Sequence, residues 1–239
     1  SERILGSAIG TRRKETVLVT KCGVGYSGRP RGRDSRKDSI LTSVDQSLQN
    51  LGTDYIDVLL IHWPDFATPI SETMEALDNA VKSGKVLHIG VSNYSLGQIK
   101  EAMETGRIDV AQYGLHMFDR RMEADIFPYC KNNDIGVMTY GSLAFGLLTG
   151  AFNRDSAFTK NDWRAGTFLP TLFLSLFEPR EFNRNLEVVE DLKILAAQQD
   201  RRIPHLALRW VLSNPAVSTA LVGIRNITEV DDNMGTLGW

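Results

Sequence analysis

The sequence has 239 residues, of which 42% are apolar and 23% charged, with 27 Lys and Arg against 29 Asp and Glu. This near-neutral, apolar composition excludes a disordered chain and gives no electrostatic reason to expect a protein that binds nucleic acid or a membrane surface. The longest apolar stretch, residues 167–177, is well short of the roughly 20 residues that a membrane helix needs. Two cysteines, Cys22 and Cys130, without a C-x-x-C motif, favour a reduced, cytoplasmic protein.

From Thr16 onward, short β-rich runs alternate with longer amphipathic segments, which predicts parallel strands joined by crossover helices. We expect strands at residues 17–21, 56–63, 86–92, 109–113, 135–140 and 217–223. We expect helices at residues 35–50, 71–83, 95–105, 122–132, 181–199, 204–213 and 228–237. Ser71 is followed by Glu75 near capping-box spacing. Gly52, Gly84 and Gly106 follow predicted helices at positions that must tolerate a positive φ.

The glycines after the first strand decide between an open doubly wound sheet and a closed barrel. A dinucleotide-binding open sheet carries G-x-G-x-x-G there. Gly23, Gly25 and Gly28 have that spacing, but they lead into Arg and Pro instead of the helix that the motif requires. We therefore expect an α/β fold of the (β/α)8 TIM-barrel type, with about six of its eight strands visible. Because residues 2–9 resemble a helix that follows an unseen strand, we expect the single barrel domain of residues 1–239 to lack its first two βα units.

Polar residues stand at the carboxyl ends of the predicted strands, where barrels of this kind carry their chemistry. Lys21, His62, Asn93, Gln112 and Tyr140 each end or directly follow one strand. Each alone has an equally good structural explanation, as a surface cation, a buried imidazole, a turn or bridging amide, or a packed ring. Their common position at one end of one sheet favours a functional site.

Several ordered motifs resemble the aldo-keto reductases. They are VLVTK ending at Lys21, IHWPD at 61–65, GKV at 84–86 with IGVSN at 89–93, Gln112, YGSL at 140–143 with GLLTG at 146–150, ALRWVL at 207–212, and VGIR at 222–225 followed by Glu229 and Asn233. The resemblance is specific because these motifs extend over nearly the whole chain. It implies the eight-stranded barrel inferred above and an enzyme that transfers hydride between a nicotinamide nucleotide and a carbonyl compound.

The resemblance also implies which residues form the site. Lys21 and His62 match two members of the family's catalytic tetrad. The cofactor-binding matches are Ser92, Asn93 and Gln112 at the carboxamide, Tyr140 stacked on the nicotinamide ring, Gly141, Ser142, Leu143, Gly146 and Leu148 in the loop over the pyrophosphate, Gly223 with Arg225, which meets the 2′-phosphate, and Glu229 and Asn233 near the adenine. Because a guanidinium fork suits a phosphate, NADP is favoured over NAD.

The implied reaction is hydride transfer to a carbonyl carbon, with a proton delivered to the oxygen. In the family that proton comes from a Tyr whose pKa is lowered by the Lys, itself paired with an Asp, while the His orients the carbonyl. That Asp and Tyr match positions before Ser1, and none of the six tyrosines of the chain matches the Tyr.

Three hypotheses follow from this pattern. The leading one is an NADP-dependent reductase of aldehydes or ketones that also runs in reverse on an alcohol. The second is a non-catalytic nucleotide-binding or regulatory protein with an incomplete tetrad. The third is a barrel that acts on phosphorylated substrates without a nucleotide.

Four other features have competing interpretations. Residues 29–37 hold five cations, for which a solvated loop is favoured over recognition of an anion. The long segment 150–183 is rich in aromatic residues, which either shape the substrate and cofactor pocket or contact a neighbouring subunit of a homo-oligomer. Trp63 either lines a pocket for an apolar substrate or packs against the next helix. His88 and His116 lack ligand spacing, so no metal, zinc included, is expected.

Overall fold

The computed structural model describes residues 1–25, 32–165 and 175–239. The predictions for Arg29, Arg31, Phe168 and Phe173 lie outside these ranges. The chain divides into two compact units. Unit 1 comprises residues 1–113, 121–138 and 215–219, and unit 2 comprises residues 114–120, 139–214 and 220–239.

A parallel sheet carries the predicted site residues of unit 1. Its described strands are β1 (Val19–Cys22), β2 (Ile56–Ile61), β3 (Val86–Ser92), β4 (Val110–Gly114), β5 (Gly136–Tyr140) and β6 (Val217–Ala220), hydrogen-bonded in that order. β1, β2, β3 and β4 pair in parallel, with Lys21 opposite Leu60 and Ser92 opposite Gln112. Because neighbours in the sequence are neighbours in the sheet, each connection is a single crossover, as in a barrel. All six predicted strands therefore form.

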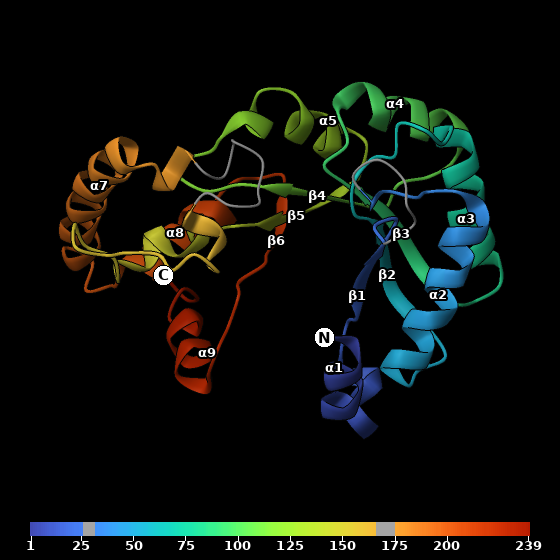
Figure 1. Ribbon diagram of the computed structural model, residues 1–239, viewed down its shortest axis with the longest axis horizontal. Helices are drawn as coiled ribbons and strands as arrows, with labels where there is room; N and C mark the ends of the chain where they lie inside the picture. The colour runs from blue at the N-terminus through green and yellow to red at the C-terminus, as the bar shows by residue number, and fades with distance from the viewer. Residues whose placement is uncertain (26–31, 166–174) are drawn as a thin grey trace. The chain divides into compact units, whose positions relative to one another are not determined.

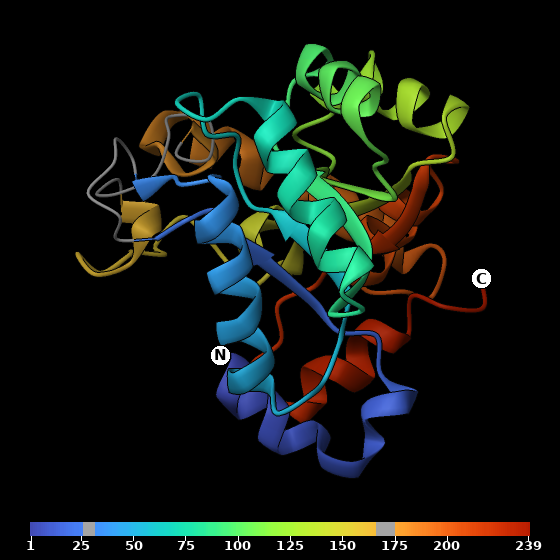
Figure 2. The same cartoon turned by 90° about the vertical axis from the view of Figure 1, so that its right-hand side faces the viewer.

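Helices cover one face of these strands in unit 1. They are α1 (Glu2–Ile9), α2 (Lys37–Leu51), α3 (Ile70–Lys82), α4 (Leu96–Thr105) and α5 (Ile126–Asn132), with short 3-10 helices η1 (Gly10–Glu15) and η3 (Arg121–Glu123). Figure 1 shows α2, α3 and α4 following one another beside β1, β2 and β3. In Figure 2 α2 and α3 run side by side in front of the strands.

Unit 2 is built mainly from helices and turns. These are η4 (Ala144–Thr149), η5 (Trp163–Ala165), η6 (Ser175–Phe177), α7 (Pro179–Ala197), α8 (Ile203–Leu212) and α9 (Ile227–Met234). Its core joins η4, α7 and α8, and the buried residues are Ala144, Leu147, Leu148, Leu176, Phe177, Phe182, Leu186, Val189, Ile203 and Ala207. The two helices predicted at residues 181–199 and 204–213 are confirmed as α7 and α8.

The helix ends agree only in part with the caps predicted from the sequence. α3 begins after Pro69 without a side-chain cap, so the role suggested for Ser71 is wrong. The capping box lies instead at α4, where Ser95 Oγ accepts from Gln98 N and Gln98 Oε1 accepts from Ser95 N. Gly52 and Gly84 have φ of 64° and 75°, as predicted. Gly106 has φ −168°, an extended conformation open to any residue.

β2 forms the buried centre of unit 1. Leu59, Leu60 and Ile61 are fully buried there. Gly90 on β3 lies so close to its neighbours that a Cβ placed on it would be 2.0 Å from the Val110 carbonyl oxygen and 2.7 Å from Leu60 Cδ2. The sheet therefore needs glycine at this point for β3 and β4 to approach each other.

Candidate active site

Lys21 and His62 stand at the carboxyl ends of adjacent strands. Lys21 lies on β1, and His62 follows β2 directly. The His62 N–H donates to the Cys22 carbonyl at 2.9 Å, which extends the β1–β2 pairing to the residue after Lys21. The parallel register thus brings the two predicted catalytic side chains to the same end of unit 1.

The electrostatics of this pair follow from their burial and proximity. Burial lowers the pKa of Lys21 below its ordinary value. Burial also lowers the pKa of His62, and the positive charge of Lys21 adds to that effect. His62 is therefore a neutral imidazole near pH 7, able to offer one N–H donor to a carbonyl oxygen.

A hydrogen-bonded amide and hydroxyl network continues this edge over β3 and β4. Asn93 Nδ2 donates to the His62 carbonyl at 3.1 Å and to Ser92 Oγ at 3.0 Å, and Ser92 Oγ donates to the Gln112 carbonyl at 3.0 Å. Asn93 adopts φ 63°, in the left-handed region that asparagine tolerates better than most residues. The three residues matched to a carboxamide are thus bonded to one another and to the backbone of His62.

The network also contains one deeply buried amide donor. Gln112 is 2% exposed, and its Nε2 has no hydrogen-bond partner among the described residues. A buried amide donor left unbonded costs free energy, about 1–3 kcal/mol. A ligand with a carbonyl oxygen at this position would satisfy it, and a carboxamide fits that chemistry.

In unit 2, Tyr140 ends β5 next to a glycine-rich loop. Its carbonyl accepts from Leu115 N at 3.2 Å, and a Cβ on Gly114 would lie 3.5 Å from the Tyr140 ring. The small Gly114 therefore leaves one face of β4 open to this ring. Ser142, by contrast, is buried, with its Oγ 3.3 Å from Thr139 Oγ1.

The loop after Tyr140 has an unusual backbone. Gly141, Ala144, Phe145 and Gly146 have φ of 68°, 48°, 56° and 102°. Non-glycine residues with such φ values cost about 1–3 kcal/mol each and occur most often at functional sites. The loop therefore holds a strained conformation.

Internal hydrogen bonds limit what this loop can offer to a phosphate. The N–H groups of Gly146 and Leu148 both donate to the Leu143 carbonyl, at 3.1 and 3.0 Å. In this conformation those two N–H groups are not available to a phosphate, although the resemblance places both residues in the pyrophosphate loop.

The residues matched to the adenosine end lie in and before α9. Arg225 Nε and Nη2 donate to Glu229 Oε1 at 2.9 and 2.6 Å, and Arg225 N donates to Glu229 Oε2 at 2.8 Å. The arginine lowers the pKa of Glu229 by this hydrogen bonding. Asn226 caps α9 by accepting from Glu229 N. Gly223 is exposed and Asn233 is partly exposed.

The segment after His62 shows residues that the sequence interpretation missed. Arg33 lies with its guanidinium carbon 5.2 Å from the centre of the Trp63 ring, and its Nη1 donates to the Pro64 carbonyl at 2.9 Å. Arg33 is thus held on Trp63, whereas the sequence favoured a solvated loop. Asp65 organises the same turn by accepting from Ser35 N and Thr68 Oγ1. An aspartate three residues before a threonine is the local signal that could have predicted this turn.

The described aromatic residues of segment 150–183 pack against one another within unit 2. Phe152 lies edge-to-face with Phe158 and Phe177 at centroid distances of 5.4 and 6.2 Å, and Trp163 contacts Phe145 at 5.2 Å. These contacts add a third explanation, a local core, to the two that the sequence left open. His88 is exposed on β3, and His116 is buried with its ring edge-on to Phe145.

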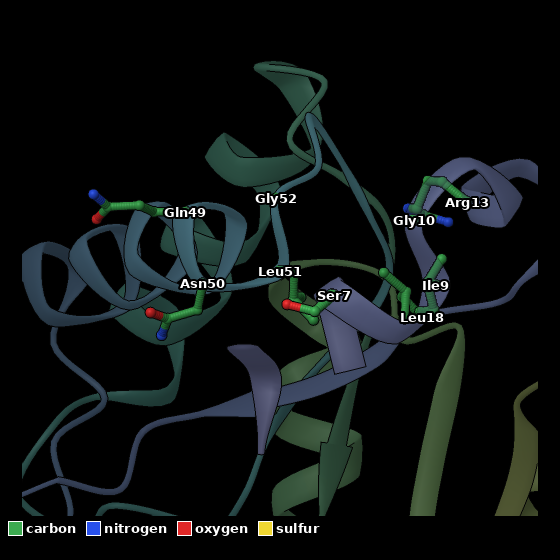
Figure 3. Close-up of a pocket in the computed structure, with 10 residues that line it drawn as sticks. Ser7, Ile9, Gly10, Arg13, Leu18, Gln49, Asn50, Leu51 and Gly52 are labelled. Carbon is green, nitrogen blue, oxygen red and sulfur yellow. The ribbon is translucent and has the colours of Figure 1, made fainter. Parts of the chain in front are cut away.

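Two cavities flank β1 in unit 1. One of about 260 Å³ lies before the strand, lined by Ser7, Leu18 and Asn50 among others (Figure 3). Arg13, which also lines this cavity, donates from Nη2 to the Tyr55 carbonyl at 2.8 Å and forms an ion pair with Asp57. The other, of about 320 Å³, follows the strand. Among the described residues that line the two cavities, none is a predicted site residue.

Within the described ranges, His, Cys, Asp and Glu form no cluster of three or more that could hold a metal ion. No helix of the described chain combines the length and the apolar character needed to cross a membrane.

Comparison with known proteins identifies relatives along the whole chain. Residues 1–238 match the profile described as "Aldo/keto reductase family". The NADH-specific methylglyoxal reductase of Escherichia coli (strain K12) is 32% identical over 251 residues, covering 99% of this chain and 74% of the relative. A probable voltage-gated potassium channel subunit beta of Arabidopsis thaliana is 32% identical over 249 residues, covering 98% and 73%.

A solved structure gives the same result for the fold. The glycerol dehydrogenase AKR11B4 from Gluconobacter oxydans superposes with a TM-score of 0.90 at 33% identity, covering all of this chain and 72% of that one. Such structural relatives are (β/α)8 barrels, which confirms the predicted fold class.

Proposed function

The chain belongs to the aldo/keto reductase family, and we propose that it reduces an aldehyde or ketone to an alcohol with NADPH as the hydride donor. Members of the family bind nicotinamide nucleotides and act on small carbonyl compounds. For this chain we propose NADPH as the nucleotide, a cytoplasmic location, and the residue roles that follow.

The observation that carries the proposal is the Gln112 Nε2 donor of the Ser92–Asn93–Gln112 network, which is buried without a hydrogen-bond partner in the part of the chain that the structure describes. A nicotinamide carboxamide has one carbonyl acceptor and one NH2 donor. Gln112 Nε2 would donate to that carbonyl, and the side-chain oxygens of the network would accept from the NH2 group. The fit supports a nicotinamide nucleotide better than a phosphorylated substrate alone.

Lys21 and His62 would act on the substrate carbonyl. When bound, the reduced nicotinamide supplies a hydride to the carbonyl carbon, the C=O π pair moves to the oxygen, and a proton completes the alcohol. His62, neutral near pH 7, would orient the carbonyl by donating its N–H to the oxygen. In the family the proton comes from a neutral tyrosine, and the positive charge of Lys21 would stabilise the tyrosinate that remains after the transfer.

The other residues matched to cofactor binding belong to unit 2. We propose that Tyr140 stacks on the nicotinamide ring, that Gly141, Ser142 and Leu143 approach the pyrophosphate, and that Arg225, Glu229 and Asn233 recognise the adenosine end. Arg225 is 88% exposed, which leaves its guanidinium accessible to a phosphate.

The test combines binding and turnover. NADPH fluorescence should titrate saturably with the purified protein, and small aldehydes should be reduced with loss of NADPH absorbance. His62→Ala should lower turnover at least tenfold while the Kd for NADPH changes less than about twofold, because His62 contacts substrate and not cofactor. The absence of saturable NADPH binding would refute the proposal.

A second candidate function is a nucleotide-binding regulatory protein. The similarity to a probable potassium channel subunit beta favours it, since that relative matches 98% of this chain. Under this reading NADPH binds saturably but a panel of aldehydes and ketones is not reduced. If no turnover is found, an intact-mass measurement shows whether the protein assayed was the 26.7 kDa chain or a longer one.

A further inference from the structure

A buried histidine and an aspartate join two helices of unit 2 at a place that the proposed reaction does not use. His205 lies in the first turn of α8, and Asp232 lies in the last turn of α9. His205 Nε2 is 3.2 Å from Asp232 Oδ1. The histidine is 8% exposed, so the contact is largely shielded from water.

The hydrogen bonds define which tautomer the neutral His205 ring adopts. His205 Nδ1 accepts from the backbone N–H of Arg202 at 3.4 Å. In the neutral imidazole the single proton must then lie on Nε2, which donates it to the carboxylate of Asp232. The His205 ring thus accepts a hydrogen bond from the backbone at the start of α8 and donates one to Asp232 of α9.

The end of α9 is shaped to fit this ring. A Cβ on Gly235 would lie 2.7 Å from His205 Cε1 and 2.8 Å from Nε2. Only a residue without a side chain lets the chain pass this close to the imidazole. The next residue, Thr236, is buried, and Arg201 stacks over Trp239 with its guanidinium carbon 5.3 Å from the ring centre.

The rest of α9 has little apolar support. Each of its eight residues is at least partly exposed. Its apolar side chains are among the most exposed of the chain, with Ile227 at 79% and Met234 at 57%. Because apolar burial fixes most helices in proteins, polar contacts near the end of α9 assume that role here.

Glu229, Asp232 and Asn233 share one side of α9, since residues three and four apart in a helix are neighbours. A helix is rigid over one or two turns, so a contact that fixes Asp232 also fixes the direction in which Glu229 and Asn233 project. Arg225 follows, because its backbone N–H donates to Glu229 Oε2 at 2.8 Å in addition to the pairing of its guanidinium with the same carboxylate.

We propose that His205 and Asp232 are positioning residues that set the orientation of α9 and thereby the adenosine-binding residues Arg225, Glu229 and Asn233. The inference rests on the proposed function. Arg202 contributes less, because its pair with Asp232 at 2.6 Å is 65% exposed on the arginine side, and exposed ion pairs contribute little.

The test compares Asp232→Ala with Asp231→Ala. Asp231 is the neighbouring exposed residue of the same helix, so the control removes the same charge without touching His205. Both proteins are titrated with NADPH and with 2′,5′-ADP, which contains only the adenosine end. Asp232→Ala should raise both Kd values on the order of tenfold, as expected for a lost hydrogen bond to a charged group. Asp231→Ala should stay within about twofold of the wild type.

Kinetics separates positioning from a general loss of structure. At saturating NADPH, Asp232→Ala should keep kcat within about twofold while the KM for NADPH rises. His205→Gln, which retains an N–H donor toward Asp232, should bind 2′,5′-ADP more tightly than His205→Ala. If Asp232→Ala unfolds, His205→Gln against His205→Ala gives the same comparison in a milder form.

The experiment distinguishes failure of the positioning role from failure of the proposed function. Equal affinities for Asp232→Ala and Asp231→Ala, in a wild-type background that binds NADPH, would overturn the positioning role and leave the proposed function intact. A wild-type protein that binds neither NADPH nor 2′,5′-ADP would overturn the proposed function together with the inference.

Discussion

Asn93 donates from Nδ2 to the carbonyl oxygen of His62 across 3.1 Å, so the loop after β3 is bonded to the residue that follows β2. The same amide donates to Ser92 Oγ, which in turn reaches the Gln112 carbonyl. A residue matched to substrate chemistry and residues matched to cofactor binding are therefore parts of one hydrogen-bonded unit. A substitution of Asn93 should therefore affect both substrate turnover and cofactor binding.

Asn93→Ala should lower the free energy of unfolding by about 2–3 kcal/mol. Two hydrogen bonds of about 1 kcal/mol each are lost, and alanine at φ 63° adds about 1 kcal/mol of backbone strain. Asn93→Gly loses the same hydrogen bonds without that strain, so it should be about 1 kcal/mol more stable than Asn93→Ala. Urea unfolding of the two variants measures the difference, and equal stabilities would contradict the left-handed conformation.

The lowered pKa of His62 predicts a pH dependence of stability. In the unfolded chain His62 titrates near 6.5, whereas in the folded protein its pKa is lower. Between those two values the unfolded state binds more protons, so stability falls as the pH drops below about 6.5 and levels off below the folded pKa. His62→Gln should show a shallower fall in the free energy of unfolding over the same range. Urea titrations at several pH values between 7 and 4.5 make the comparison, and parallel profiles for the two proteins would refute it.

Gly90→Ala should destabilise the protein by about 3 kcal/mol or more, since its Cβ would overlap the Val110 carbonyl. Gly97→Ala is the matched control, because the same substitution in α4 meets its nearest atom, Ser95 Oγ, at 3.9 Å. The control should be neutral or stabilising by about 0.5 kcal/mol. Thermal unfolding of both variants tests the close approach of β3 and β4, and similar Tm values for both would show that the sheet relaxes around position 90.

The sequence predicted the strands well because their signal is local. An apolar run such as residues 56–61 is buried on both faces whatever its neighbours are, and a polar residue that ends the run must lie at the sheet's carboxyl edge. Lys21, His62 and Gln112 could therefore be chosen from the sequence. The residue types at those positions then carried the family resemblance.

Contacts between distant segments could not be predicted in the same way. His205 and Asp232 are 27 residues apart, and their meeting depends on how the chain passes Gly235. Arg33 was one cation in a basic segment, and only the fold shows that it lies on Trp63. The internal bonds of the loop at Leu143 depend on left-handed residues, Ala144 and Phe145, whose side chains give no such signal.

The pair formed by Arg225 and Glu229 makes the cofactor preference testable in both directions. Arg225 offers a guanidinium to a 2′-phosphate, but in the structure Glu229 already accepts from its Nε and Nη2. A phosphate must compete with that carboxylate and also approach its negative charge. The methylglyoxal reductase relative that is named as NADH-specific shows that a preference for NADH occurs among proteins this similar.

Arg225→Ala should therefore weaken NADPH about tenfold or more and NADH less than about twofold, because only NADPH contains the 2′-phosphate that we propose the guanidinium binds. Glu229→Gln should act in the opposite direction. It frees the guanidinium and removes a negative charge near the phosphate, so the ratio of the NADH Kd to the NADPH Kd should rise a few-fold. Fluorescence titration of the wild type and both variants with each nucleotide, at fixed ionic strength, gives the three ratios. If Arg225→Ala weakens both nucleotides equally, Arg225 does not meet the 2′-phosphate; if Glu229→Gln leaves the ratio unchanged, the carboxylate does not compete for the arginine.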